Sequence, residues 1–150
     1  MSTYSWLKLI HVLAAIVAVG TNVTYFLWLR LARRDPAGSA GILRGIKALD
    51  ARLANPAYGI LPIAGVLLVL DGHIGFTTFW VLGAIILYAI VGLSAGLLFA
   101  PSLRRQTDLA VQGTDPAAYE AAARRTTTTG LITMVPVLMI LYLMIMNPTP

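Results

Sequence analysis

The sequence predicts an all-α membrane protein, a four-transmembrane-helix bundle that lies in a lipid bilayer with both termini outside. One reason is composition: 58% of the residues are apolar and 11% are charged, whereas about 25% of the residues of soluble domains are charged. The other is that four apolar runs approach the roughly 20 residues that a helix needs to cross the ~30 Å hydrocarbon layer. We expect residues 1–150 to form a single integral membrane domain.

The four predicted spans differ at their ends. The first is too long for the apolar region of a signal peptide, and Arg30, Arg33 and Arg34 close it as in a stop-transfer segment. The second and fourth are short, so we expect their helices to extend upstream through Leu53 and Thr126. The predicted spans are residues 6–29, 54–70, 76–100 and 129–146.

The positive charges predict the direction of the spans. Every lysine and arginine except Lys8 lies within residues 30–52 or 104–125, the segments that follow the first and third spans. Because lysine and arginine gather on the cytoplasmic side of membrane proteins, both termini and the loop at residues 71–75 are expected to face outward. The same rule accounts for the net charge of +5 without a nucleic-acid partner.

Short amphipathic helices are predicted in the two cytoplasmic loops. Asp35-Pro36 and Asp115-Pro116 each place an N-cap residue before a proline suited to the first helical position. In the first loop, apolar residues recur at helical spacing with basic residues between them, at Ile42, Leu43, Ile46, Leu49 and Leu53. Such a helix either lies on the inner leaflet or packs on the bundle.

Small residues and prolines predict how the spans pack. Gly92 and Gly96 form a small-xxx-small pair that lets another helix approach closely. Pro62 and Pro136 are expected to kink the second and fourth spans. The threonines that lead into the fourth span can bond back to carbonyls of their own helix. These features predict a compact bundle.

Polar residues interrupt the first span at Lys8, His11 and Asn22. At 100° per residue, Asn22 lies only about 20° around the helix from His11. The alanines at positions 14, 15 and 18 share that face, which is typical of a surface turned toward partner helices. His11 and Asn22 are therefore expected to point inward, whereas Lys8 is close enough to the outer surface for its side chain to reach water.

A polar cluster is predicted near the outer boundary. Asp71 and His73 follow the second span directly, at about the depth of Lys8 and one turn above His11. Because an aspartate at a helix C-terminus is disfavoured by the helix dipole, Lys8 is the expected partner of Asp71. The predicted cluster contains Lys8, His11, Asp71 and His73, and Asn22 is added to these polar residues because it shares the inward face of His11. For Asp71 and His73 the alternative is an ordinary solvated turn. For His11 the alternative is a histidine that hydrogen-bonds a neighbouring helix.

His11 and His73 are the candidate ligands for a cofactor, haem b or copper. Imidazole is a common ligand of haem iron and of copper(II). Zinc normally takes three or four protein ligands, which would require Asp71 as well. The sequence has no cysteine, catalytic triad or phosphate-binding loop, and no carboxylate lies deep within a span. These observations argue against thiolate chemistry, hydrolysis and proton pumping.

Two segments resemble a known family. "LKLIHVLAAIVAVGTN" and "LDARLANPAYGILPIAGVLLVL" are similar to domain of unknown function family 2269, small bacterial membrane proteins. The resemblance implies a four-helix bundle in the bacterial cytoplasmic (inner) membrane. It also implies kinship with copper-resistance protein D and with a haem-associated protoporphyrinogen oxidase family, whose early histidine matches His11. The oxidases pair that histidine with a lysine in a later span, and spans two to four contain none.

Three functions are compatible with these observations. The leading hypothesis is a noncatalytic bundle or accessory subunit that packs against itself, as a homo-oligomer, or against a larger membrane complex. The alternative is a b-type haem or copper protein that uses His11. A second alternative, a small-solute transporter, rests on the kinked spans.

Overall fold

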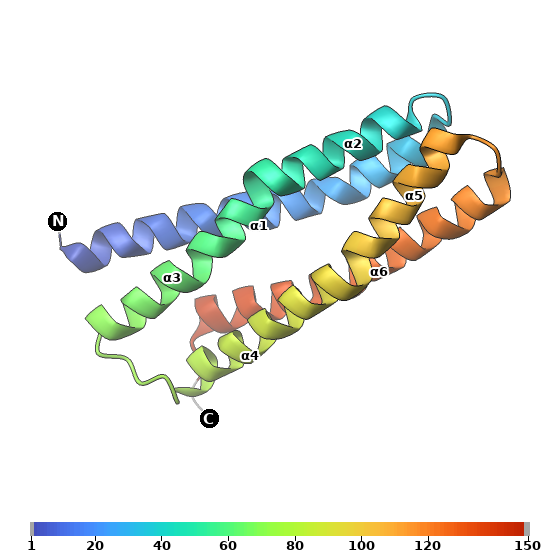
Figure 1. Ribbon diagram of the computed structural model, residues 1–150. Coiled ribbons are helices and arrows are strands. Elements are labelled where there is room, and N and C mark those ends of the chain that lie inside the picture. The colour runs from blue at the N-terminus through green and yellow to red at the C-terminus, as the bar shows by residue number, and fades with distance from the viewer. Residues whose placement is uncertain (1, 149–150) are drawn as a thin grey trace.

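The computed structural model describes residues 2–148, and all regular structure in this part of the chain is helical (Figure 1). The predicted all-α fold class is confirmed. The helices are α1 (Thr3–Arg34), α2 (Ser39–Leu49), η1 (Asp50–Ala54), α3 (Asn55–Asp71), α4 (Phe79–Ser94), η2 (Ala95–Phe99), α5 (Ala100–Gln112) and α6 (Pro116–Met146).

In the described residues these elements join into four helices, each long and apolar enough to cross a membrane. The amphipathic helix expected in the first loop is α2, and it continues through η1 into α3 as one helix, Ser39–Asp71. In the same way α4, η2 and α5 form one helix, Phe79–Gln112. The sequence analysis did not predict this extension, because α5 is polar and lies beyond the third apolar run.

The two π-helical segments η1 and η2 each end two residues before a proline, Pro56 and Pro101. A proline inside a helix offers no amide and its ring clashes with the carbonyl one turn back. In a π turn the bonds span five residues, as from the amide of Asn55 to the carbonyl of Asp50. The wider turn makes room at the proline, so the helix continues instead of ending.

One of the two predicted Asp-Pro helix starts is confirmed and the other is wrong. Asp115 caps α6, where its carboxylate accepts from the amide of Ala118 at 2.9 Å. Asp35 instead ends α1, since its own amide bonds the carbonyl of Leu31. Its carboxylate accepts from the amide of Gly38 at 3.0 Å, which closes a turn before α2 begins at Ser39.

The third predicted span also begins too early. Residues 76–78 are not helical, because the amide of Thr78 bonds the carbonyl of Gly75 at 3.0 Å and closes a turn. The helix starts at Phe79, after Thr78. The fourth predicted span ends at residue 146, where α6 ends.

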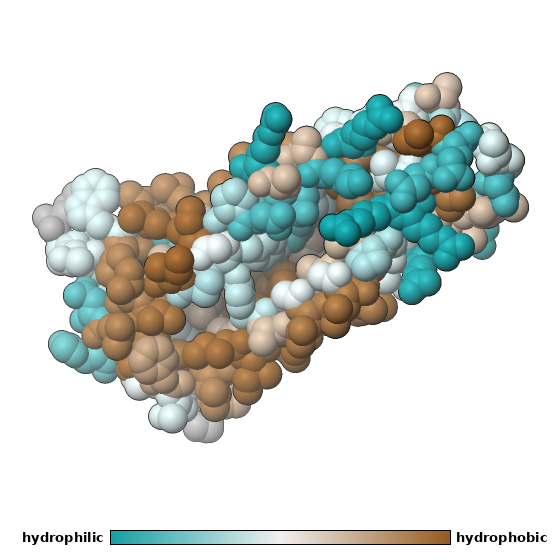
Figure 2. All heavy atoms as spheres, in the orientation of Figure 1, coloured by the Kyte–Doolittle hydropathy of each residue, from teal (hydrophilic) through white to brown (hydrophobic). Residues whose placement is uncertain are grey.

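The helices form two layers. α1 packs on α2 and α3, and α6 packs on α4 and α5; contacts of α1 with α6 and of α2 with α5 join the layers (Figure 1). Within the described residues α3 packs on neither α4 nor α6. The layers therefore diverge toward the end that carries the chain termini, and the space-filling view is hollowed between them (Figure 2).

The two ends of the bundle have different interiors. We call the segments 28–52 and 101–126 the basic end, where hydrophilic residues cover much of the surface (Figure 2). Its interior is a cluster of large side chains, Leu29, Leu43, Ile46 and Leu103, which Tyr25 extends by one turn of α1. The opposite half buries mainly smaller side chains, alanines such as Ala18 and Ala64 and valines such as Val81, and its exterior is apolar, as expected of a surface in contact with lipid.

Candidate functional site

His11 lies at the interface between α1 and α3. Its Nδ1 is 3.1 Å from the carbonyl oxygen of Leu61, and because a carbonyl only accepts, Nδ1 donates the proton. The ring rests against Gly65, where an added Cβ would lie 3.3 Å from Cε1 of His11. The glycine thus leaves room for the imidazole between the two helices.

A second polar contact surrounds Pro62. A proline at this position leaves the carbonyl of Tyr58, one turn earlier, without its helical amide partner. The hydroxyl of Tyr88 donates to that carbonyl, and the side-chain amide of Asn22 donates to the hydroxyl of Tyr58. Asn22 therefore ties α1 to α3, and Tyr88 bridges α3 to α4 where the backbones do not pack.

A third contact lies nearer the basic end. The hydroxyl of Tyr25 donates to Asp50 at 3.2 Å, and the side-chain amide of Asn55 is 3.5 Å from the other carboxylate oxygen. The sequence analysis missed Asp50, Tyr58 and Tyr88. The carbonyl of Tyr58 could have been predicted to need a partner, because Pro62 lies four residues later and has no amide to bond it. No neighbouring residue in the sequence indicates that Asp50 makes such a contact.

In the described residues no hydrogen bond or ion pair joins Lys8, Asp71 or His73 to His11. Lys8, Asp71 and His73 are exposed, and the structure shows no ion pair between Lys8 and Asp71. His73 sits at a positive φ of 50° in the turn after α3. Across residues 2–148 no group of three histidine, cysteine or acidic side chains could hold a metal ion.

The arrangement along α1 and α3 is one of helix-to-helix hydrogen bonds. Asn22, about three turns along α1 from His11, contacts Tyr58 and not the imidazole. The carboxylate of Asp50 bonds Tyr25 and Asn55. These side chains can hold the helices in register, and each polar contact compensates for the loss of water on burial.

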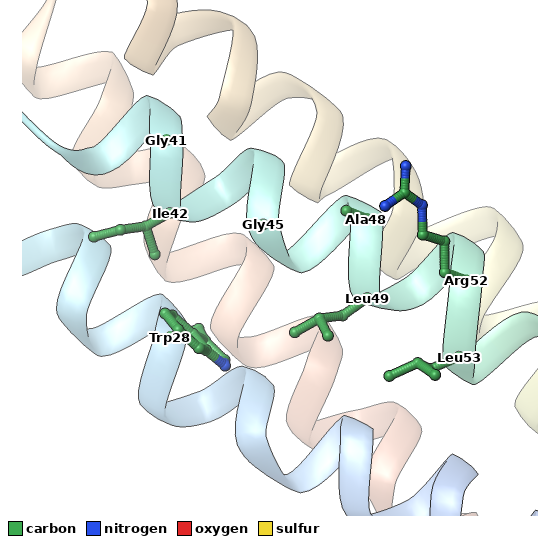
Figure 3. A pocket seen from close by; sticks show the side chains of 8 residues that line it. All are labelled: Trp28, Gly41, Ile42, Gly45, Ala48, Leu49, Arg52 and Leu53. Carbon is green, nitrogen blue, oxygen red and sulfur yellow. The ribbon is translucent and has the colours of Figure 1, made fainter.

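A groove of about 730 Å³ runs between α1 and α2 on the outside of the basic end. Figure 3 shows its lining, with Trp28 of α1 facing Ile42 and Leu49 of α2, and with Gly45 on the floor. The Arg52 side chain runs back along the helix toward Ala48. The groove is thus an apolar depression with one guanidinium at its edge.

At the basic end Glu120 joins the layers electrostatically. Its carboxylate accepts from Arg33 of α1 and, at 3.2 Å, from Arg124 one turn along α6. These guanidinium groups, Arg33 first, hold the pKa of Glu120 below its ordinary value of 4.5. The ion pair is exposed, so water screens it.

Replacing Glu120 by glutamine is expected to lower the free energy of unfolding at neutral pH by at most about 1 kcal/mol. Because folding lowers this pKa, the stabilisation is present above pH 4.5 and is lost as the pH falls through the lowered value. Unfolding of wild type and Glu120→Gln, followed from neutral to acidic pH, should show a difference that narrows on acidification. Asp108→Asn, which removes an exposed carboxylate outside these ion pairs, is the control; an equal effect there would contradict the prediction.

Comparison with known proteins identifies a family. Residues 5–148 match the family described as "Predicted integral membrane protein (DUF2269)". No curated protein and no solved structure matches the chain.

Proposed function

We propose, from the premise that this chain belongs to the DUF2269 family of predicted integral membrane proteins, that it is a noncatalytic multi-pass subunit that acts by association within the membrane. Its partner is a second copy of the chain or a larger complex. The observation that carries the proposal is a face of small residues on α4 and η2 that the chain's own helices leave uncovered.

This small face consists of Ala89, Gly92 and Gly96. A Cβ added at Gly92 or Gly96 would meet no atom within 4 Å, and Ala89 is exposed. On the helix Gly92 and Gly96 lie about 40° and 80° from Tyr88, the residue that reaches α3. The face therefore borders the side on which α3 and α4 diverge.

Other glycines show how the chain uses this residue for close packing. A Cβ at Gly83 would meet Leu143 of α6 at 3.0 Å, and one at Gly130 would meet Phe99 at 3.3 Å. Lipid tails are as apolar as leucine, so the hydrophobic effect does not favour contact between helices in a membrane. Helices there associate instead through the van der Waals contacts that close approach allows. An uncovered small face is thus suited to receive a helix from outside the chain.

The proposed orientation follows from the positive charges. We place the basic end in the cytoplasm of a bacterial cell and both termini outside, since lysine and arginine favour the cytoplasmic side. The shared end of the two termini supports an even number of membrane crossings. Cysteines engineered at the two termini test this orientation. In intact cells, a thiol reagent that cannot cross the membrane should label both of them.

Association through the small face is tested by disulfide crosslinking. The chain has no cysteine, so Ala89→Cys introduces a unique thiol on the face. Oxidation in membranes should yield a crosslinked dimer at least about fivefold more abundant than with Ile63→Cys, whose position on α3 is 64% exposed. Adding Gly92→Leu and Gly96→Leu should remove the dimer by filling the face.

The control for those leucines is Gly20→Leu, because a Cβ at Gly20 on α1 likewise meets nothing within 4 Å. It should leave the Ala89→Cys dimer intact. Equal crosslinking at positions 63 and 89, or equal loss with Gly20→Leu, would mean random collision in the membrane and would refute association through this face.

A second candidate function is binding of b-type haem or copper at His11, with His73 as a further ligand. One observation favours it: donation from Nδ1 to Leu61 leaves Nε2 without a proton, which is the tautomer that a metal binds. The test is the absorbance spectrum and metal content of gently purified protein. A Soret band or stoichiometric copper that is lost with His11→Ala would support this candidate, and its persistence in that variant would exclude His11 as the ligand.

A further inference from the structure

A small pocket lies between α5 and α6 at the basic end. It has a volume of about 210 Å³ and is lined by Pro101, Ser102, Arg105, Ala122 and Arg125. Arg105 of α5 and Arg125 of α6 thus line one space together with small residues. This space is several times the roughly 30 Å³ that a water molecule occupies in the liquid, so it can hold a phosphate group.

The pocket lies at the depth of the lipid headgroups. Arg105 follows the end of the third apolar run by five residues and Arg125 precedes the fourth by four, which places them about 7.5 Å and 6 Å beyond the apolar layer. The headgroup region extends about 5–8 Å beyond the hydrocarbon on each side. Both arginines therefore lie where lipid phosphates lie.

Neither arginine has a carboxylate partner in the described residues. Glu120 is occupied by Arg33 and Arg124. Asp108 lies three residues after Arg105 but forms no ion pair with it. The pocket is therefore a site of uncompensated positive charge, and guanidinium groups bind phosphate oxygens through paired N–H donors.

The surroundings distinguish a lipid from a free anion. One turn deeper than Pro101 and Ser102 lie Leu97 and Leu98, which are 71% and 40% exposed. An acyl chain can rest on these side chains while its phosphate lies between the arginines. The hydroxyl of Ser102 donates to the carbonyl of Leu98 at 2.7 Å, so the guanidinium groups supply the donors.

We propose that the pocket between Arg105 and Arg125 binds the phosphate of an anionic phospholipid in the leaflet on the basic side. The proposal is independent of association through the small face, because the two surfaces share no residue. A basic surface attracts anionic lipid in general, through all of its charges. The proposal instead assigns the preference for anionic over neutral lipid to Arg105 and Arg125.

The test is lipid retention by the full-length protein, measured by native mass spectrometry from micelles that contain equal amounts of phosphatidylglycerol and phosphatidylcholine. Wild type should retain phosphatidylglycerol preferentially. Arg105→Gln with Arg125→Gln should reduce that preference by roughly tenfold or more. The matched control, Arg34→Gln with Arg104→Gln, removes two exposed charges from the same end and outside the pocket, and should change the preference less than about twofold.

Two further measurements decide the source of the phosphate and the state of the variant. Millimolar inorganic phosphate should leave the lipid bound; displacement would assign the pocket to a free anion and overturn the proposal. Arg105→Lys with Arg125→Lys restores both charges but not the paired N–H donors, and should recover part of the preference, which separates lost binding from lost folding. A control pair as defective as the glutamine pair, or a lysine pair without recovery, would also overturn it.

Discussion

Replacing Leu43 by alanine is expected to lower the free energy of unfolding by about 2–5 kcal/mol. Leu43 is 0% exposed and packs in the basic end with Leu29 and Ile46. Leu43 lies between the first and second predicted spans, residues 6–29 and 54–70, so we expect its burial to remove it from water, and the hydrophobic effect then stabilises this packing. Truncation removes buried methyl groups and leaves a cavity that rigid neighbouring helices cannot close.

The matched control for this truncation is Leu31→Ala. Leu31 is on α1 in the same end but is 40% exposed, so it loses less buried area and leaves no closed cavity. Unfolding in detergent, followed by circular dichroism under increasing denaturant, should show less than half the destabilisation seen for Leu43→Ala. Equal effects would mean that the basic end has no tightly packed interior.

Replacing Gly65 by valine is expected to destabilise the protein by about 1–3 kcal/mol. A Cβ at this position already lies 3.3 Å from Cε1 of His11, and two further methyl groups require the imidazole to move. The ring then loses its bond to the carbonyl of Leu61 and α1 separates from α3. Gly59→Val on the same helix is the control, since a Cβ there meets nothing within 4 Å.

A double-mutant cycle assigns this effect to the histidine. His11→Ala alone should cost about 0.6 kcal/mol and at most about 1.7, the range measured for hydrogen bonds between membrane helices. In the double variant the valine has room, so the combined loss should be smaller than the sum of the two single losses. Additive losses, or a Gly65→Val effect no larger than that of Gly59→Val, would show that His11 does not lock this interface.

The helical period was enough to predict which residues of the first span share a face. His11 and Asn22 lie within about 20° of each other because 11 residues are close to three turns, and each now bonds α3. Their partners, Leu61 and Tyr58, could not be predicted, since they depend on the vertical register of two helices. That register is set by many apolar contacts that no local pattern reports.

Depth alone was not enough to predict the contacts of the outer polar residues. Lys8, Asp71 and His73 were expected together because they occupy similar levels in the sequence-predicted spans, and the structure shows no ion pair between Lys8 and Asp71. Asp35-Pro36 failed for a related reason: the residue pair that caps a helix also closes a turn, and the carboxylate bonded the amide of Gly38. Sequence patterns thus predicted elements and faces better than contacts.

The sequence predicted that Gly92 and Gly96 form a packing site. Only the structure could show that, within residues 2–148, no other helix of the chain packs against them. The sequence implies that a helix can approach there, and the fold leaves the position open. The proposed function rests on that difference. We therefore propose association, and not chemistry at His11, as the function of the protein.

The most direct test of this account is the mass of the untagged protein released from its native membrane together with bound lipid. Native mass spectrometry should show two or more copies of the 150-residue chain, or one copy with another protein, and Gly92→Leu with Gly96→Leu should convert these species to the single chain. A folded single chain at every protein concentration, in wild type as in the variant, would contradict the proposal that this protein acts by association.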